Sequence, residues 1–254
     1  AAFVNLDISE RVNRGELCTA MENVDTVFHC AALARVQPSI QNPQKYHKAN
    51  VDGTLNILLS ARDSKVRRVV YSASSSAYGD QPISPQVETM PTAPISPYGL
   101  QKLIGEQYCF VFSKCYGLET VNLRYFNVYG PREPIKGKYA PVIGLFKRQF
   151  LSGQKMTIVG DGSQRRDFTY IDDVIDANIC AMKASVSDIK HNVYNVGTGK
   201  NYSINEITEM FGDKVEYISK RPAEVKETLA EINATTKDLG WLPKHDLSKN
   251  INSY

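Results

Sequence analysis

Residues that bind metals or form disulfides are scarce in this sequence. It has only 5 cysteines and 4 histidines among 254 residues. The cysteines show no Cys-x-x-Cys spacing, and their odd number argues against a disulfide framework, so we expect reduced thiols in the core. The histidines form no His-x-x-x-His pair and have no acidic partner at metal-ligand spacing. No metal site is expected.

Long apolar runs and an excess of one charge are also missing. No window of about 18 uninterrupted apolar residues occurs, and the first residues lack the basic-then-apolar order of a signal peptide. Lysine plus arginine outnumber aspartate plus glutamate by only 30 to 27, which gives a formal net charge of +3. These features predict a cytoplasmic protein that binds neither membranes nor nucleic acids.

Apolar segments of strand type and helix type alternate through the first half of the chain. The run DTVFHCAAL is typical of a strand covered on both faces, and VRRVVYSAS is predicted to be the next strand. Between them, Val51, Leu55, Leu58 and Leu59 recur at helical spacing. This alternation favours right-handed crossovers and a parallel sheet, so the sequence predicts an α/β fold.

The stretch from Val69 to Lys102 carries the strongest chemical signal. After a strand and a serine cluster, a helix that begins at Ser96 and Pro97 presents Tyr98 and Lys102 on one face. An ammonium beside a phenol stabilises the phenolate, so we expect Lys102 to lower the pKa of Tyr98 and make the tyrosine a general base. The pair alone is weak evidence, because any long helix can carry this spacing by chance.

The same helix is apolar around most of its circumference. Residues 108–112 read Tyr-Cys-Phe-Val-Phe, and Gly117 marks the predicted end of the helix. One face can meet the sheet and another can meet a partner, so we expect this helix and the segment 43–64 to form a four-helix interface in a homodimer. Burial of both faces within one large domain is the alternative.

Eight sequence blocks in a fixed order carry a family resemblance. They read TVFHCAAL, NVDGTLN, VVYSASSSAYGDQP, SPYGLQK, LRYFNVYGPR, GDGSQRRDFTYIDDV, YNVGTG and RPAEV. With them the chain resembles the extended short-chain dehydrogenases/reductases, and among these the NAD-dependent nucleotide-sugar 4-epimerases. The resemblance implies a Rossmann-type doubly wound parallel sheet with a smaller C-terminal α/β substrate domain. It assigns residues 1–130 and about 167–198 to an NAD-binding domain, and residues 131–166 and 199–254 to a nucleotide-sugar-binding domain.

One block of that family is absent from this sequence. The family begins with a βαβ unit whose Gly-x-x-Gly-x-x-Gly turn holds the cofactor pyrophosphate at a helix N-terminus. This sequence opens instead at FVNLDIS, which the resemblance assigns to the third strand. Either a segment precedes the sequence given or the chain is a truncated product, and a truncated chain is expected to bind NAD poorly.

The resemblance also implies which residues border NAD, with Asp7 and Ile8 at the adenine. The implied contacts are Asp7, Ile8, Cys30, Ala31, Ala32, Ala34, Ser72, Tyr98, Lys102, Tyr125 and Phe126. Many relatives have a polar cofactor contact where this chain has Ala49, so that contact is not expected here. The neighbouring Asn50 is equally suited to satisfying buried backbone groups inside its helix.

For the nucleotide sugar, the resemblance implies small and polar residues around the hexose and arginines at the diphosphate. The implied contacts are Ala34, Arg35, Val36, Ser74, Ser75, Ser76, Asn127, Thr157, Val159, Arg166, Arg221, Glu224 and Thr228. Among them, Glu224 would accept from the uridine ribose, and Thr157 and Val159 would border the base. A solvated surface charge is the ordinary alternative for an isolated arginine.

The implied reaction is 4-epimerisation through a 4-keto sugar, with Tyr98, Lys102, Ser74 and Ser75 as catalytic residues. Relatives that dehydrate the sugar carry an acidic pair where this chain has serines, so a 4,6-dehydratase is disfavoured. Thr228 stands where epimerases restricted to plain hexoses have tyrosine, so we expect UDP-N-acetylglucosamine and UDP-N-acetylgalactosamine as substrates, with or without UDP-glucose and UDP-galactose. Another nucleotide-sugar enzyme of the extended family, such as a reductase, and a non-catalytic dinucleotide-binding protein stay open as alternatives.

Overall fold

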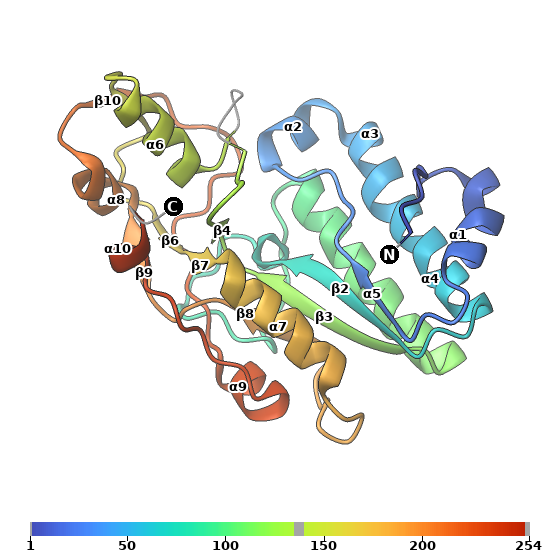
Figure 1. Cartoon of the computed structure of the whole chain (residues 1–254). Helices are drawn as coiled ribbons and strands as arrows, with labels where there is room; N and C mark the ends of the chain where they lie inside the picture. The colour runs from blue at the N-terminus through green and yellow to red at the C-terminus, as the bar shows by residue number, and fades with distance from the viewer. Residues whose placement is uncertain (1, 135–139, 252–254) are drawn as a thin grey trace.

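A four-stranded parallel sheet forms the centre of the larger lobe in the computed structural model, which describes residues 2–134 and 140–251 (Figure 1). Its order is β1-β2-β3-β8, and all three pairings are parallel. The strands are β1 (Thr26–His29), β2 (Arg68–Ser74), β3 (Glu119–Tyr125) and β8 (Val193–Val196). The predicted α/β class with a parallel sheet is confirmed.

Helices cover both faces of this sheet (Figure 1). Side chains alternate along β2, so Val69 and Tyr71 join the cluster beneath α4 (Gly53–Asp63) and α5 (Pro97–Tyr116). Val70 points the other way, into the cluster that contains residues of α7 (Ile171–Lys183). Every residue of β2 is buried. The two-sided cover expected for DTVFHCAAL is wrong, because this run forms β1, in which Phe28 is 42% exposed.

The ends of α5 follow the predicted signals. Ser96 accepts a hydrogen bond from the Gly99 backbone amide at 3.1 Å, and Pro97 is the first helical residue. Gly117 ends the helix with a φ of 70°, a conformation that costs glycine little. These contacts fix where Tyr98 and Lys102 stand relative to the sheet.

The predicted helix over 43–64 is present as one continuous helical segment. It comprises α3 (Pro43–His47), a π-helical stretch η2 (Lys48–Asp52) and α4. Other helices of the larger lobe are η1 (Arg11–Asn13), α1 (Arg14–Ala20), α2 (Val36–Gln41) and η3 (Ser75–Ala77).

A second, smaller lobe packs around its own apolar cluster, which includes Phe146, Ile158 and Ile207. Figure 1 shows it beside the carboxyl ends of the sheet strands. Its elements are β4 (Val128–Tyr129), α6 (Val142–Leu151), β5 (Met156–Val159), β6 (Arg165–Asp167), β7 (Thr169–Tyr170), β9 (Asn201–Ser203), α8 (Ile204–Phe211), β10 (Val215–Ile218) and α10 (Leu247–Asn250). The remaining helix, α9 (Asn233–Leu239), packs on β8 of the larger lobe.

The strand expected at FVNLDIS is wrong, because residues 2–7 carry no regular structure. A strand needs hydrogen bonds to a neighbour, and among the described residues β1 pairs only with β2. Phe3 is 90% exposed, whereas Ile8 packs against the cluster beneath α4. The segment is held there by a hydrogen bond from the Asn56 amide to the Ile8 carbonyl oxygen at 2.9 Å.

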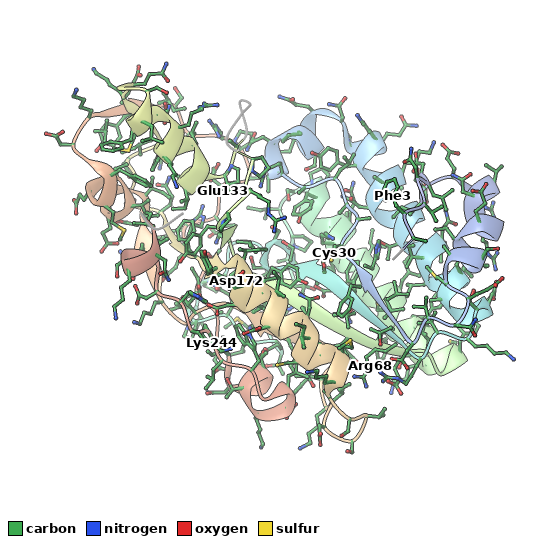
Figure 2. The ribbon with its side chains drawn as sticks, viewed as in Figure 1. Phe3, Cys30, Arg68, Glu133, Asp172 and Lys244 are labelled. Atoms are coloured by element: carbon green, nitrogen blue, oxygen red, sulfur yellow. The ribbon has the colours of Figure 1, made fainter. Side chains whose placement is uncertain are left out.

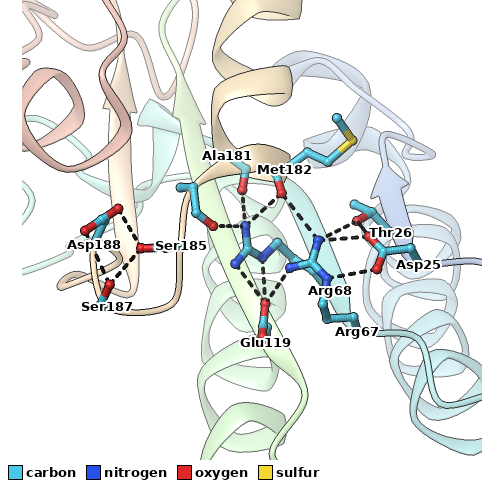
Figure 3. A network of polar contacts seen from close by, with 11 residues as sticks. Asp25, Thr26, Arg67, Arg68, Glu119, Ala181, Met182, Ser185, Ser187 and Asp188 are labelled. Carbon is cyan, nitrogen blue, oxygen red and sulfur yellow. Dashed lines mark hydrogen bonds and ion pairs between the residues drawn. The ribbon is translucent and has the colours of Figure 1, made fainter.

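A buried arginine holds α7 at the amino end of the sheet (Figure 3). Arg68 is fully buried and donates to the carbonyl oxygens of Ala181, Met182 and Ala184 at 2.7, 2.9 and 2.7 Å. Its Nε donates to the Glu119 carboxylate at 2.9 Å. These bonds satisfy carbonyl groups that the last turn of a helix leaves open. Figure 2 labels Arg68 at this end of the sheet and Cys30 at the opposite, carboxyl end.

Candidate active site

Two cavities open at the carboxyl edge of the sheet. The first, which we call the apolar cavity, has a volume of about 500 Å³. It is lined by Phe28, Cys30, Ala32, Ala34, Ser72, Ala73, Tyr98, Lys102, Tyr125, Val128, Ile171, Val174, Ile175, Asn178 and Ile179. The second, the polar cavity, has a volume of about 320 Å³ and lies between the two lobes. The two cavities adjoin where Ala34, which lines the apolar cavity, is followed by Arg35, which lines the polar cavity.

The polar cavity contains most of the residues predicted to meet a nucleotide sugar. Predicted residues in its lining are Arg35, Val36, Ser75, Ser76, Asn127, Thr157, Val159, Arg166, Arg221, Glu224 and Thr228. They come from α2, η3, the end of β3, β5, β6 and the 221–228 segment. Only the folded chain brings these separate blocks together.

Tyr98 and Lys102 lie near the start of α5 and both line the apolar cavity. The Tyr98 backbone amide donates to the Ser39 hydroxyl at 3.1 Å, which ties α5 to α2. The Lys102 ammonium donates to the Ser72 carbonyl oxygen at 2.7 Å and lies 4.9 Å from the centre of the Tyr71 ring. The lysine is therefore anchored to β2 below the tyrosine.

The electrostatics of this pair differ from the prediction. Burial raises the pKa of Tyr98, although a hydrogen bond with Ser74 and the charge of Arg35 act in the opposite direction. The expected lowering of this pKa by Lys102 is thus wrong for this structure. Burial also lowers the pKa of Lys102 to about 8, so the lysine is mainly protonated at pH 7. Positive charge near the phenol comes from Arg35 on the polar side.

The serine cluster connects the two cavities. Ser74 ends β2, and its hydroxyl accepts from the Ser76 backbone amide at 3.2 Å and donates to the Ser76 hydroxyl at 3.1 Å. Ser72, two residues earlier, lies 3.1 Å from the Tyr125 hydroxyl and donates to the Cys30 sulfur at 3.3 Å. Because side chains alternate along a strand, both serines face the same side of β2.

The loop after β1 is held in place by Asn50. The asparagine accepts from the Leu33 backbone amide at 2.8 Å and donates to the Leu33 carbonyl oxygen at 3.0 Å and to Gln101 at 3.1 Å. The structural role considered for Asn50 is confirmed, but its backbone partner is the loop and not its own helix. Tyr46 adds a hydrogen bond to the Ala34 carbonyl oxygen at 2.7 Å.

The basic end of the polar cavity centres on Arg166, whose side chain is only 11% exposed. Its guanidinium lies 3.4 Å from the Glu224 carboxylate, and Arg221 lines the same cavity. Two arginines and one carboxylate therefore line this end of the cavity. At the other end, the Asn127 amide donates to the Thr228 hydroxyl at 3.3 Å.

Some predicted residues line neither the apolar cavity nor the polar cavity. They are Asp7, Ile8, Ala31, Ser74 and Phe126. The Asp7 carboxylate accepts from the Ser9 amide and hydroxyl, which lowers its pKa. Phe126 is fully buried against Tyr78 and Ala230, and Ser74 acts through its bonds to Ser76 and Tyr98. Their contacts with cofactor or substrate stay predictions.

Two supporting residues were missed in the sequence. Asp167 is fully buried, and its carboxylate accepts from the backbone amides of Thr198, Gly199 and Ala230, so it joins the Gly-rich exit of β8 to the segment that carries Thr228. Its place in the block GDGSQRRDF was the available signal. Asn178 of α7, which hydrogen-bonds the Tyr125 hydroxyl, follows no motif.

The described residues contain no group of three or more His, Cys, Asp or Glu that could hold a metal ion. None of the described helices is long and apolar enough to cross a membrane.

Known proteins place this arrangement in a family. A family model described as the NAD dependent epimerase/dehydratase family matches residues 1–197. The chain belongs to this family. Within the NAD-dependent epimerase/dehydratase family, a relative from Methanocaldococcus jannaschii named as a putative UDP-glucose 4-epimerase is 37% identical, over 99% of this chain and 82% of its own length.

Solved structures of family members agree with the fold. The UDP-N-acetylglucosamine 4-epimerase of Methanobrevibacter ruminantium, in complex with UDP-N-acetylmuramic acid, is 34% identical with a TM-score of 0.89, covering 98% of this chain and 79% of that one. The UDP-glucose 4-epimerase of Thermus thermophilus, in complex with NAD, is 30% identical with a TM-score of 0.86, covering 97% and 81%. The predicted family, its Rossmann-type fold and its NAD-dependent 4-epimerase class are confirmed.

Proposed function

We propose that this chain carries the catalytic and sugar-nucleotide sites of a UDP-sugar 4-epimerase that uses NAD. One observation supports this above the others: Tyr98 and Lys102 line an apolar cavity that adjoins a polar cavity bearing serines at one end and arginines at the other. A phenol between a hydride acceptor and a sugar hydroxyl is what oxidation at C4 requires.

The apolar cavity suits the nicotinamide half of NAD. Phe28, Val174 and Ile175 offer apolar surface to a planar ring, and the small side chains of Ala32 and Ala34 leave room beside them. The Lys102 ammonium and the Tyr125 hydroxyl provide polar groups for ribose hydroxyls. When bound, NAD would take the hydride from the sugar C4 and return it.

The chain's own residues would move the proton. Tyr98 takes the proton of the C4 hydroxyl, and Ser74, which already hydrogen-bonds the phenol, positions or passes it. Lys102 would hold the ribose, and Ser75 and Ser76 would face the hexose from the polar cavity. Arg35, whose charge acts to lower the pKa of Tyr98, would favour the phenolate. The 4-keto sugar then turns within the cavity and is reduced on its other face, which needs a tight hold on the diphosphate and a loose one on the hexose.

The substrate assignment rests on the polar cavity. Arg166 and Arg221 would clamp the diphosphate, Glu224 would accept from the ribose, and Thr157 and Val159 would border the uracil. Thr228 leaves room beside the hexose, which supports UDP-N-acetylglucosamine and UDP-N-acetylgalactosamine as substrates, with UDP-glucose and UDP-galactose as further candidates.

The domain division and the homodimer belong to the same proposal. The larger lobe would bind NAD and the smaller lobe the nucleotide. The lobes depart from the boundaries given by the sequence at β4 and β7, which belong to the smaller lobe, and at α9, which packs on the larger one. Leu100 and Val111 of α5 are 48% and 45% exposed, and such apolar groups on the outer face of α5 support pairing with the same helix of a second copy.

The cytoplasmic location stays a prediction.

A panel of UDP-sugars incubated with the purified protein and NAD tests the proposal. We expect interconversion of the two N-acetylhexosamine forms, and a loss of about 10²–10⁴-fold in kcat for Tyr98→Phe with NAD still bound. NAD binding by the wild type without turnover of any UDP-, GDP- or dTDP-sugar would support the non-catalytic alternative instead.

A further inference from the structure

One side chain of the smaller lobe hydrogen-bonds Thr157 through both of its polar atoms. This residue, Gln149, lies on α6 and is only 8% exposed. Its Nε2 group donates to the Thr157 hydroxyl at 2.6 Å, and its Oε1 accepts from the Thr157 backbone amide at 3.1 Å. Thr157 lines the polar cavity and Gln149 lies outside the lining, so the glutamine contacts the wall of this cavity from behind.

The spacing along α6 explains how Gln149 reaches this wall. Val142 and Phe146 line the polar cavity, and Gln149 follows one turn beyond them on the same face of the helix. The helix and β5 share the apolar cluster of the smaller lobe, in which Phe146 and Ile158 are fully buried. Packing therefore fixes the distance that the glutamine side chain spans.

Thr157 stands at the open edge of a two-stranded sheet. Along the other edge β5 pairs with β10, where the Met156 amide donates to the Lys214 carbonyl oxygen at 2.8 Å. Backbone groups of successive residues point to opposite edges of a strand, so the Thr157 amide points away from β10. Gln149 provides the hydrogen-bond acceptor that a third strand would otherwise supply there.

The two hydrogen bonds fix the direction of the Thr157 hydroxyl. A backbone amide can only donate, so the Gln149 atom that meets it must be the oxygen, and the nitrogen must face the hydroxyl. The hydroxyl oxygen is thus an acceptor towards Gln149, and its own hydrogen must be donated elsewhere. Within residues 2–134 and 140–251, the Thr157 hydroxyl donates to no other group.

We propose that Gln149 is a positioning residue that makes Thr157 a hydrogen-bond donor to a carbonyl oxygen of the nucleobase, so that the polar cavity selects uracil over cytosine. This inference deepens the proposed function and rests on it, because it takes the base of a nucleotide sugar to lie beside Thr157. Uracil carries an oxygen acceptor at C4, whereas cytosine carries an amino donor there. Two donors cannot hydrogen-bond each other, so cytosine would leave both groups unsatisfied.

The neighbouring residue on β5 leaves this selection to Thr157. Val159 faces the same side of the strand and also lines the cavity, but its side chain has no polar atom. Its carbonyl oxygen already accepts from the Gln164 side chain at 2.9 Å. Of the two side chains proposed to border the base, only that of Thr157 can therefore respond to the group at C4.

Binding of UDP and of CDP to the full chain, measured by calorimetry, tests the inference without NAD and without turnover. The wild type is expected to bind UDP at least about tenfold more tightly than CDP. In Gln149→Glu both side-chain oxygens are acceptors, so the Thr157 hydroxyl would donate to the carboxylate and turn a lone pair towards the base. We therefore expect the ratio of UDP affinity to CDP affinity to fall by about tenfold.

Two comparisons separate this role from mere structural support. Gln154→Glu is the matched control, because it adds the same charge at an exposed position outside the polar cavity, and it should leave the ratio within about twofold. Thr157→Val removes the hydroxyl, and in that background Gln149→Glu should also change the ratio by less than about twofold. If Gln149 only ties α6 to β5, Gln149→Glu weakens UDP and CDP binding by the same factor, and the inference fails.

A second substitution covers the case in which Gln149→Glu does not fold, since it buries a carboxylate. Gln149→Met has a similar length and no hydrogen-bonding group that directs the Thr157 hydroxyl. The hydroxyl can then turn either way, so the ratio should fall by about threefold. A wild-type ratio in folded Gln149→Met overturns the inference.

Assays with UDP-sugars distinguish this inference from the proposed function. Selective UDP binding that is lost in Gln149→Glu, in a protein that turns over no UDP-sugar, would refute the epimerase and leave the role of Gln149 intact. Epimerisation of UDP-sugars by a wild type that binds CDP as tightly as UDP would leave the epimerase intact and refute the role of Gln149.

Discussion

The Asn127 side-chain amide donates to the Thr228 hydroxyl at 3.3 Å, and it also donates to the Asp167 carbonyl oxygen at 2.9 Å. The Asp167 backbone amide in turn donates to the Thr228 hydroxyl at 3.3 Å. A residue after β3 and a residue on β6 therefore converge on Thr228 and fix its place in the wall of the polar cavity.

Replacement of Thr228 by tyrosine should change which sugars react. A phenol ring would fill space beside the hexose, so Thr228→Tyr is expected to lower kcat/KM for N-acetylhexosamine substrates by at least about 100-fold, about 2.7 kcal/mol, while UDP-glucose stays within about tenfold. Thr228→Ser keeps the hydroxyl and should behave as the wild type. Turnover of UDP-galactose alone by the wild type would contradict the assignment.

Arg166 should contribute mainly to binding. Arg166→Gln removes a charge-assisted contact with the diphosphate, so KM for a UDP-sugar should rise about 10- to 100-fold with a smaller effect on kcat. Arg165→Gln is the matched control, because the neighbouring side chain pairs with Glu206 and lies outside the polar cavity. Equal kinetic effects of the two substitutions would argue against a diphosphate at Arg166.

Periodicity and end signals predicted the helices and the parallel sheet because those patterns are local. Ser96, Pro97 and Gly117 delimit α5 by contacts within a few residues. The strand expected at FVNLDIS failed because pairing depends on a neighbour that local sequence does not specify.

Site chemistry was less predictable than site location. The blocks with Ser75, Arg166 and Thr228 do meet in one cavity, but the pKa of Tyr98 depends on how deeply the phenol is buried, which spacing along a helix does not reveal. The same holds for the buried ion pair of Glu106 on α5 and Arg124 on β3, which no spacing in the sequence indicates.

Asp246 should make stability depend on acid pH. Hydrogen bonds from Ser248 and from Lys200 and Tyr202 at β9 lower the pKa of Asp246 to about 2. The folded-state pKa lies below the unfolded value of 3.8, so the stabilisation is present above pH 4 and is lost as the pH falls towards 2. Partial exposure reduces it to about 1–2 kcal/mol.

Urea unfolding of Asp246→Asn against pH measures this contribution. The asparagine can still accept at the start of α10, so the variant should be less stable than the wild type at pH 6 and should approach it at pH 2–3. A constant difference across this range would show that the carboxylate charge is not the cause.

Substitution of alanine for two helical glycines should change the stability of the protein in opposite directions. A Cβ added at Gly105 of α5 would lie 2.2 Å from the Tyr71 hydroxyl oxygen, and Tyr71 is only 1% exposed and cannot move aside freely. Gly105→Ala is therefore expected to cost about 1–3 kcal/mol, even though alanine is the better helix former. At Gly15 of α1 nothing lies within 4 Å, so Gly15→Ala should stabilise the protein by about 0.5–1 kcal/mol. Urea midpoints of the two variants measured side by side provide the check, and a stabilised Gly105→Ala would mean that α5 and β2 are less closely packed than this contact requires.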